Sequence, residues 1–583
     1  MLSENDNRVE KERYLLMKRN FGRKLLGLSL AACMVLSLGA CGGVETETGK
    51  TQASSSAQTE AASAAESTAA QTGGEKEMHG NIEMPLAEGA ELTIWAPILE
   101  TNVTDYDTNA LTVWYEEMTG VHINWITCQS TDREEKFNLL MASGDYPDII
   151  MNNNIKASQV MQYKDLVFRP LNDLIDAGYA PNYKAFLDSA DPAVVDALTA
   201  PDGNIYGFPY LEMEKHMLAS NKMFVNKDWL DKLNLEIPKT TEEFKDMLIA
   251  FRDNDPDGNG AQDQVALTGS PTGWGTDPTS FIMSAFVIPG KNYMMADENG
   301  NITFNANSDA WREGLKYMND LYKEGLIGEE VFTQDSTQLN SLVQSGTVGA
   351  VASAWQGVFA DNVTVPYSAY VPLLPVKGPE GVQGTATNSV GGVNQVGFRC
   401  MISSSCKNPE LAIQWIDYFM SDEGLLKGFY GTEGVDYNTV DEPGLNGITP
   451  GIELIEKSST EATNTTWGSW NTPWIPKEEI YYLTTAPEGS ASQLLYDAAK
   501  QYEPYMVYTG FPIQSWSDNA DLIAEETELN TTITDFIKSA TAEFVVGRQD
   551  INDDAAWQAY CDQLKTLGVD RWVEITAQIN FAD

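Results

Sequence analysis

The chain has 583 residues and is strongly acidic, with 84 Asp and Glu against 37 Lys and Arg and a formal net charge of −47. This charge excludes a general affinity for nucleic acid or anionic lipid headgroups, which carry the same sign, and it disfavours a strongly acidic ligand. The chain is also too long for one hydrophobic core, so we expect two or more lobes.

The first forty residues have the pattern of a targeting signal. A basic stretch precedes an uncharged apolar run from Leu25 to Ala40, which is too short to span a membrane comfortably. Small residues directly before Cys41 are typical of lipoprotein signal peptides. We therefore predict a lipoprotein signal peptide over residues 1–40, lipid attachment at Cys41 and a location on the outer face of the cell membrane. The alternative is an ordinary secretory signal followed by a chance cysteine.

Residues 41–81 are predicted to form a tether. Ser, Ala, Thr, Gln, Glu and Gly dominate this segment, and large apolar side chains are almost absent. Such a composition cannot bury enough surface to offset the chain entropy, so we expect disorder. The folded body is then predicted to cover residues 82–583.

The body opens with alternating strand and helix patterns. Strands are predicted at 91–96, 121–127 and 148–151, with helices at 111–118 and 134–141 between them. Gly120 and Gly144 are expected to end these helices, and Thr131 with Glu134 has the spacing of a capping box. The order strand, helix, strand, helix, strand predicts an α/β fold with a mostly parallel sheet.

Two later segments have clear helix starts. Thr240 and Glu243 form a capping pair ahead of an apolar stripe made by Phe244, Met247, Leu248 and Phe251. Asn408 and Pro409 are typical of an N-cap and a first helical turn.

Four cysteines follow Cys41, and none of them has metal-ligand spacing. The sequence leaves undecided whether Cys400 and Cys406 form a disulfide.

Several motifs together resemble a known family. They are Asp202-Gly203-Asn204-Ile205-Tyr206-Gly207-Phe208-Pro209, Phe224-Val225-Asn226-Lys227-Asp228-Trp229-Leu230, Pro238-Lys239-Thr240, the loop 255–260 and Gly431-Thr432-Glu433-Gly434. In this order and spacing the chain is similar to the solute-binding lipoproteins of bacterial carbohydrate ABC importers, in the large branch typical of Gram-positive bacteria. The resemblance covers the chain from Glu91 to the C-terminus. It implies a periplasmic-binding-protein-like fold of two α/β lobes, an interlobe cleft, a hinge and a membrane permease as partner.

An acidic loop is the sharpest local chemistry in the chain. Asp255, Asp257, Asn259 and Asp263 place oxygen-bearing side chains at alternate positions, with the Ala261 carbonyl between them and Gln264 at the end. Oxygen ligands at this density suit calcium, and the intervening glycines allow the backbone to turn tightly. The resemblance also implies a structural calcium ion here. The family commonly has Glu where this chain has Gln264, which predicts a lower affinity, and a solvated turn is the alternative.

Aromatic residues in polar surroundings are candidates for ligand contact. Sugars present apolar faces and rings of hydroxyl groups, so their sites combine aromatic side chains with short polar ones. The candidates are Tyr206, Tyr210, Trp274, Trp355, Trp467, Trp470 and Trp474, with Glu433 as a polar candidate. For each aromatic residue, packing in a core is the competing interpretation, and we expect three or four of the seven to contact ligand.

Enzymatic functions receive little support. The chain has only three His, and none lies in a zinc or nucleophile motif. Two carboxylates suffice for glycoside hydrolysis, so a surface-anchored glycosidase is the main alternative, and a surface adhesin is another. We predict a monomeric, non-catalytic protein that captures an extracellular oligosaccharide by hinge closure and delivers it to the permease.

Overall fold

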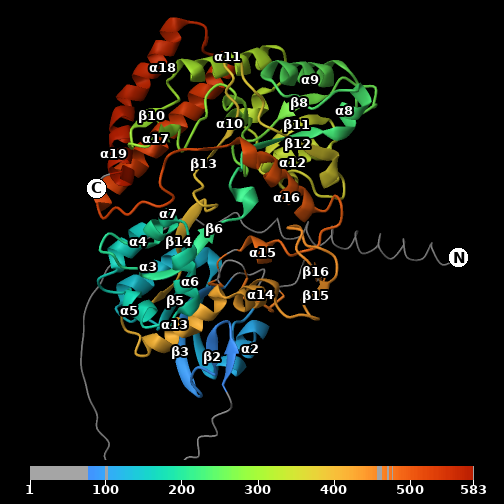
Figure 1. The fold of residues 1–583 in the computed structure, drawn as a ribbon. Helices are drawn as coiled ribbons and strands as arrows, with labels where there is room; N and C mark the ends of the chain where they lie inside the picture. The colour runs from blue at the N-terminus through green and yellow to red at the C-terminus, as the bar shows by residue number, and fades with distance from the viewer. Residues whose placement is uncertain are drawn as a thin grey trace, which may run out of the picture. The chain divides into compact units, whose positions relative to one another are not determined.

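The computed structural model describes residues 76–98, 103–455, 463–468, 472, 473, 475 and 477–581, without the side chains of residues 153 and 154. The predicted signal peptide, Cys41, nearly all of the tether, Trp470 and Trp474 lie outside these residues. Within them, two lobes are each built around a sheet with its own hydrophobic core (Figure 1). This arrangement confirms the two-lobed α/β prediction.

Lobe 1 contains a five-stranded sheet in the order β4-β3-β5-β14-β6. Its strands are β3 (Ala90–Ile98), β4 (Val121–Gln129), β5 (Ile149–Ile155), β6 (Gly207–Glu212) and β14 (Gln395–Ile402). The first three strands in sequence run parallel, as predicted, whereas β14 is antiparallel to both of its neighbours. β14 inserts between β5 and β6 because the chain returns to lobe 1 after building most of lobe 2.

Helices cover the lobe 1 sheet. They are α2 (Ala110–Thr119), α3 (Arg133–Ser143), α4 (Ala157–Tyr163), α5 (Asn172–Asp176), α6 (Pro181–Ser189), α7 (Pro192–Leu198), α13 (Pro409–Asp417), α14 (Asp422–Tyr430) and α15 (Glu478–Tyr481). Gly120 and Gly144 end α2 and α3 with left-handed backbone, as expected. The capping box predicted at Thr131 and Glu134 is wrong. A 3₁₀ turn over Ser130–Asp132 precedes α3, so the helix begins at Arg133, one residue later than the motif requires.

Lobe 2 contains a four-stranded sheet in the order β12-β7-β11-β8. Its strands are β7 (Lys222–Asn226), β8 (Val265–Thr268), β11 (Val348–Ser353) and β12 (Tyr370–Leu373). Its helices are α8 (Lys227–Leu233), α9 (Thr241–Asp253), α10 (Pro278–Met283), α11 (Asp309–Lys323) and α12 (Ser336–Gln344). Thr240 caps α9 as predicted, because its hydroxyl accepts from the backbone N–H of Glu243, and the four residues of the predicted stripe are buried.

The last part of the described chain, from residue 491, also belongs to lobe 2. It supplies α16 (Ala491–Tyr502), α17 (Ala520–Val545), α18 (Asp554–Thr566) and α19 (Val569–Phe581). Ile537 of α17 and Trp572 of α19 share one hydrophobic core with Trp311 of α11, and Figure 1 shows the three helices side by side. Lobe 2 is therefore assembled from two distant stretches of sequence.

Short two-stranded sheets complete the described chain. They pair β1 (Glu77–His79) with β2 (Ile82–Met84), β9 (Met294–Ala296) with β10 (Ile302–Phe304), β13 (Thr385–Thr387) with β17 (Met506–Tyr508), and β15 (Tyr437–Val440) with β16 (Gly451–Leu454). β13 and β17 run parallel. This pairing joins the segment between β12 and β14 to the segment between α16 and α17.

The chain passes between the lobes three times. It leaves lobe 1 after β6, returns between β12 and β14, and leaves again between α15 and α16. These three segments are where a hinge can operate. The four described cysteines, Cys128, Cys400, Cys406 and Cys561, are all free, so the disulfide left open by the sequence is not formed.

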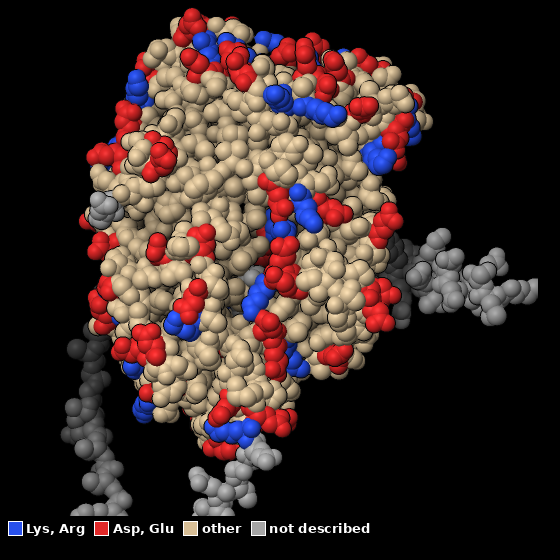
Figure 2. Space-filling view, viewed as in Figure 1, with Lys and Arg blue, Asp and Glu red and all other residues tan. Residues whose placement is uncertain are grey.

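The folded body begins earlier than the sequence predicted. Strand β1 lies in the range assigned to the tether and pairs with β2. His79 Nδ1 lies 2.9 Å from Glu423 Oε1, and the backbone N–H of Gly80 donates to Glu423 Oε2 at 2.9 Å. Composition alone could not predict this pair of strands, because the polar hairpin is held by a partner helix that is far away in sequence. Acidic side chains are spread over much of the face drawn in Figure 2.

Candidate ligand-binding cleft

The carboxyl ends of the strands mark the candidate site. β5 and β6 run in the same direction, so both carry their last residues to one edge of the lobe 1 sheet. In lobe 2, β8 and β11 run parallel and lead into the loops 269–275 and 354–357. Ligands of open α/β sheets bind beyond the carboxyl ends of the strands. We therefore expect the ligand to bind at these edges and loops.

Residues of both lobes line two cavities. The larger has a volume of about 480 Å³ and is lined by Lys156, Ser158 and Asn394 of lobe 1 and by Lys291, Ser517 and Ile579 of lobe 2. The smaller has a volume of about 220 Å³ and is lined by Glu214, Lys215, Gly391, Tyr481, Tyr482 and Glu503. The segment 388–396 lines both cavities, so they lie on either side of one crossing segment.

Lobe 2 contributes a pair of tryptophans at its carboxyl edge. Trp274 is 38% exposed, and its ring meets that of His216 edge-on at a centroid distance of 6.0 Å. The backbone N–H of Ala354 donates to the Trp274 carbonyl at 3.0 Å, which places Trp355 in the next segment. Trp355 packs against Tyr367 at 5.6 Å. Two of the predicted aromatic candidates are therefore brought together.

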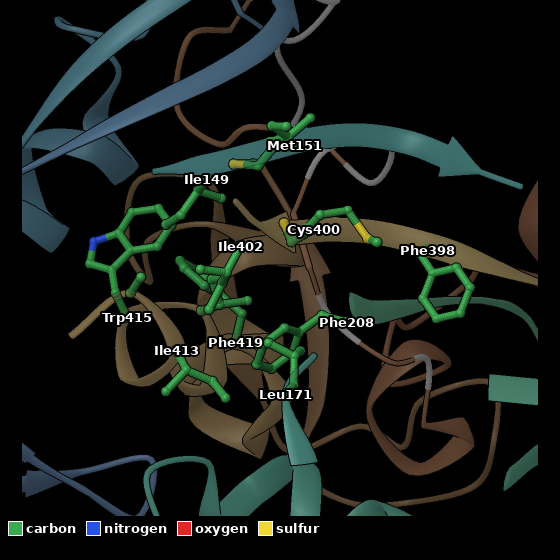
Figure 3. Packing of buried hydrophobic residues seen from close by; sticks show 14 of the residues in the cluster. Ile149, Met151, Leu171, Phe208, Phe398, Cys400, Ile402, Ile413, Trp415 and Phe419 are labelled. Carbon is green, nitrogen blue, oxygen red and sulfur yellow. The ribbon is translucent and has the colours of Figure 1, made fainter. Parts of the chain in front are cut away.

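Lobe 1 contributes an aromatic and charged cluster. β14 carries Phe398, Cys400 and Ile402 into the core (Figure 3), and between them Arg399 stacks on the Tyr210 ring at 4.9 Å. Arg399 Nη1 donates to the Thr472 carbonyl at 2.6 Å. Burial lowers the pKa of Arg399 to about 10 and raises that of Tyr210 to about 12. Tyr210 stays a predicted contact residue, and it lies on β6 next to the segment that contains Glu214.

A buried carboxyl lies next to this cluster. Burial raises the pKa of Glu214, and the neighbouring Glu212 adds to the shift. Glu212 Oε2 accepts from Asn394 Nδ2 at 2.6 Å, which ties the end of β6 to the segment 388–396. Carboxylates accept hydrogen bonds from sugar hydroxyls, and side-chain amides both donate and accept them. The cluster therefore suits a polyhydroxylated ligand.

An ion-pair network spans the crossing segments. Lys215 Nζ lies 2.6 Å from Glu503 Oε1 and 3.3 Å from Glu478 Oε2. The backbone N–H of Lys215 also donates to the hydroxyl of Tyr482 at 2.9 Å. The first crossing segment is thereby attached to residues on both sides of the third.

Sequence reasoning missed the residues of this network. Glu214, Lys215 and His216 are adjacent in sequence, yet they belong to no motif. Arg399 did leave a signal, because it is the single charged residue in the apolar strand β14. Tyr481 and Tyr482 form an aromatic pair at the end of a short helix that the sequence did not predict.

Three predicted contact residues lie elsewhere. Tyr206 precedes the amino end of β6, away from the carboxyl edge, and its hydroxyl donates to Asp202 Oδ2 at 2.7 Å. The prediction for Trp467 is wrong: the residue is fully buried, and its indole N–H donates to Thr112 Oγ1 at 2.8 Å. Glu433 is exposed beside β15. Trp470 and Trp474 lie outside the described residues.

The acidic loop lies between α9 and β8. One carboxylate, Asp255, accepts from the backbone N–H groups of Gly258, Asn259 and Gly260 at 3.0, 3.1 and 2.9 Å. Its contact with the Asp257 side chain and these N–H groups lower its pKa. Gly258 and Gly260 have φ values of 78° and 77°, so the tight turn needs glycine at both positions.

Amide nitrogens lie between the carboxylates of this loop. Asn259 Nδ2 donates to Asp257 Oδ2 at 2.8 Å and to Asp263 Oδ1 at 3.1 Å, and Gln264 Nε2 donates to the same two residues. Gln264 Oε1 is buried without a hydrogen-bond partner. With a cation between the carboxylates, the amide groups of Asn259 and Gln264 would turn so that their oxygens face the cation, and Gln264 Oε1 would become a ligand. The oxygen donors of the loop therefore fit a hard cation. The described residues contain no group of three His, Cys, Asp or Glu side chains arranged to bind a metal ion. The candidate donors of this loop are instead a mixture of carboxylate, amide and backbone carbonyl oxygens.

Two α/β lobes, three crossing segments and cavities lined from both sides define a protein that binds its ligand between lobes. Residues 92–425 match the model of the bacterial extracellular solute-binding protein family, and the chain belongs to this family. The family expected from sequence is confirmed. No helix in the described part of the chain has the length and apolar character needed to cross a membrane.

Related proteins are similar to this chain over most of its length. The fructooligosaccharide ABC transporter substrate-binding protein FusA of Streptococcus pneumoniae serotype 4 is 31% identical over 520 residues, which is 85% of this chain and 90% of the relative. The FusA structure in complex with kestose has a TM-score of 0.63 at 28% identity and covers 84% of this chain and 98% of that one. A FusA EF-hand mutant in complex with fructo-nystose gives the same values.

Proposed function

We propose that this protein captures a neutral oligosaccharide of the fructooligosaccharide class between its lobes and delivers it unchanged to an ABC permease. The observation that supports this most is the similarity to FusA along 85% of the chain. The exposed Trp274 and its neighbour Trp355 offer apolar faces to a sugar ring, and Tyr210 and Glu214 offer polar groups from the other lobe.

Charge in the smaller interlobe cavity favours a neutral ligand over an acidic one, whereas the larger cavity is lined by Lys156 and Lys291. Another relative, the polygalacturonan/rhamnogalacturonan-binding protein YtcQ of Bacillus subtilis, is 25% identical over 332 residues. In this chain the net charge is −47, and Glu214, Glu478 and Glu503 line the smaller interlobe cavity with only Lys215 as a basic residue. A ligand made of uronic acids would meet unfavourable electrostatics there.

Calorimetric titration tests the ligand class. Kestose and nystose should bind the mature protein and raise its melting temperature, because a ligand that binds only the native state stabilises it. Trigalacturonate and maltotriose serve as acidic and neutral comparators. Binding of trigalacturonate without binding of kestose would overturn the proposal.

The absence of turnover is part of the same proposal. Kestose incubated with excess protein and then released by denaturation should give one intact trisaccharide peak in anion-exchange chromatography. Free fructose or sucrose in that sample would favour the surface glycosidase instead. An adhesin would bind no small oligosaccharide at all.

We infer that the loop 255–264 holds a structural calcium ion. Asp255, Asp257, Asn259, Asp263 and Gln264 would supply side-chain oxygens, with the Ala261 carbonyl, and the ion would neutralise crowded carboxylates. Calcium added to metal-stripped protein should raise the melting temperature, and Asp257→Asn should abolish that rise. Asp297→Asn, in a second Asp/Asn turn of the same lobe, is the matched control. No calcium response in the unmodified protein would remove the site.

We also propose lipid anchoring at Cys41. Replacement of this residue with Ser should release the protein from the membrane fraction, whereas Cys33→Ser within the apolar run should not. Equal release by both variants, or by neither, would contradict the anchor.

A further inference from the structure

Lys222 is a fully buried lysine at the start of β7, just inside lobe 2. Its ammonium donates to the carbonyl oxygens of His216 and Ala354, each at 3.3 Å, and to that of Ala219. Among the described residues it forms no ion pair with a carboxylate. Its three N–H donors are thus directed at three backbone carbonyls, which is the full capacity of an ammonium group.

These carbonyls belong to the segments that carry the aromatic candidates of the cleft. His216 packs edge-on against Trp274, and Ala354 directly precedes Trp355. The N–H of Ala354 in turn donates to the Trp274 carbonyl at 3.0 Å. One buried cation therefore connects the first crossing segment with the loop after β11, and through that loop with the loop after β8.

The three segments approach one another without spare room. A Cβ atom at Gly275 would lie 2.2 Å from the Ser220 carbonyl oxygen and 2.6 Å from the Ala354 nitrogen. Such close contacts between backbones require a residue without a side chain. Close backbone contacts therefore contribute to the arrangement of Trp274, His216 and Trp355, beside the ring contacts of these residues.

Burial lowers the pKa of Lys222 to about 7, because an ammonium group is costly to keep in this volume. Taking an ammonium out of water costs several kcal/mol, whereas a methionine of similar length would pack at no such cost. The nearest aromatic face is Tyr502, whose ring centroid lies 5.6 Å from Nζ. What the charge provides, and a methionine cannot, is a set of three hydrogen bonds to separate segments.

We propose that Lys222 is a positioning residue for ligand binding: its ammonium holds the segments that present Trp274, His216 and Trp355 to the oligosaccharide. This role rests on the proposed function, because it assigns Lys222 to the cleft that binds the sugar. Lys222 itself is fully buried and does not touch the ligand.

The affinity for kestose tests the role. Lys222→Met should weaken kestose binding by about tenfold or more, equivalent to about 1.4 kcal/mol, because the segments that carry Trp274 and Trp355 lose their hydrogen bonds to the ammonium. Lys222→Gln keeps a donor amide and should fall between Met and the unmodified protein. Lys245→Met, in the same lobe but paired with Asp320 on the surface, is the matched control and should bind normally. Kestose affinity of Lys222→Met within twofold of the control would overturn the proposal.

Hydrogen exchange provides a readout that needs no ligand. In the ligand-free protein, Lys222→Met should speed amide exchange in 272–276 and 353–358, while α9 and α11 keep their protection. If Lys222→Met does not fold, the same comparison is made with Lys222→Gln. Unchanged exchange in both segments would reject the positioning role. If kestose fails to bind the unmodified protein, the proposed function falls, and the exchange result still decides the role of Lys222.

Discussion

Trp467 and Trp274 have similar local sequences and opposite environments. Each lies among Thr, Ser, Gly or Pro residues, with no apolar stripe on either side. Trp467 is fully buried against Tyr115, Trp415 and Phe419 in lobe 1, whereas Trp274 is 38% exposed at the edge of lobe 2.

The difference comes from partners that are distant in sequence. Thr112, on α2, accepts the indole N–H of Trp467 across more than 350 residues, so the ring can be buried without an unsatisfied donor. Trp274 lies in a loop whose neighbours are His216 and the backbone of Ala354. A polar local sequence therefore does not distinguish a core tryptophan from a site tryptophan; the remote partner does.

The largest effect is expected at the core residue. Trp467→Ala should lower the free energy of unfolding by about 3–5 kcal/mol, since it leaves a large cavity in a dense aromatic cluster. Urea denaturation measures this change. Trp274→Ala is the paired control and should change the unfolding free energy by less than about 1 kcal/mol. Equal stability losses in the two variants would break the comparison.

The reverse pattern is expected for ligand affinity. Trp355→Ala should weaken kestose binding by about 2 kcal/mol, close to thirtyfold, through loss of an aromatic contact face. Calorimetric titration gives the value, and Val363→Ala, at a position that is 88% exposed in the same lobe, is the control. Unchanged kestose affinity in Trp355→Ala would assign this residue to packing, like Trp467.

The pH dependence of stability should reveal the surroundings of Trp274. Burial, and then the charge of Lys222, lower the pKa of His216 to about 4, below its ordinary value of 6.5. The unfolded chain therefore takes up this proton first, and the associated stability is lost as the pH falls from about 6.5 towards 4.

Replacing this histidine should remove that loss. Between pH 7 and pH 5, His216→Asn should lose about 1–2 kcal/mol less stability than the unmodified protein. His122, which is exposed and contacts Glu116, supplies the control variant His122→Asn. Parallel pH profiles for His216→Asn and the unmodified protein would show that the ring is not buried beside Trp274.

The smallest expected change in stability concerns the hydrogen bond that holds the buried Trp467. Thr112→Val keeps the shape of the side chain but removes the acceptor for the Trp467 N–H, which should cost about 1 kcal/mol. Thermal unfolding of this variant can be compared with Thr119→Val, whose hydroxyl donates to the carbonyl of Tyr115 within the same helix. A Thr112→Val protein as stable as the unmodified one would mean that the hydrogen bond contributes nothing to burial.

Local patterns predicted much of the fold. Alternation and helix stripes located β3, α2, β4, β5 and α9 because these elements are set by short-range periodicity and by caps. The same patterns could not place β14 next to β5. That pairing joins residues near 150 to residues near 400, and nothing local encodes it.

The site was less predictable than the fold. Trp274, Trp355 and Tyr210 stay candidates that were chosen by residue type and polar surroundings, and the same criteria also selected Tyr206 and the buried Trp467. Tyr206 precedes β6, whereas Tyr210 lies within it towards the carboxyl end, and the local sequence does not distinguish the two positions. Lys222 could not be found at all, since its role depends on carbonyls contributed by three segments.

Small-angle X-ray scattering tests the capture of a sugar between the lobes most directly. Saturating kestose should reduce the radius of gyration of the mature protein, because contacts with both lobes favour the closed state. The Trp355→Ala protein should need a higher kestose concentration for the same change. Kestose that binds at saturation and leaves the radius of gyration unaltered would contradict the account.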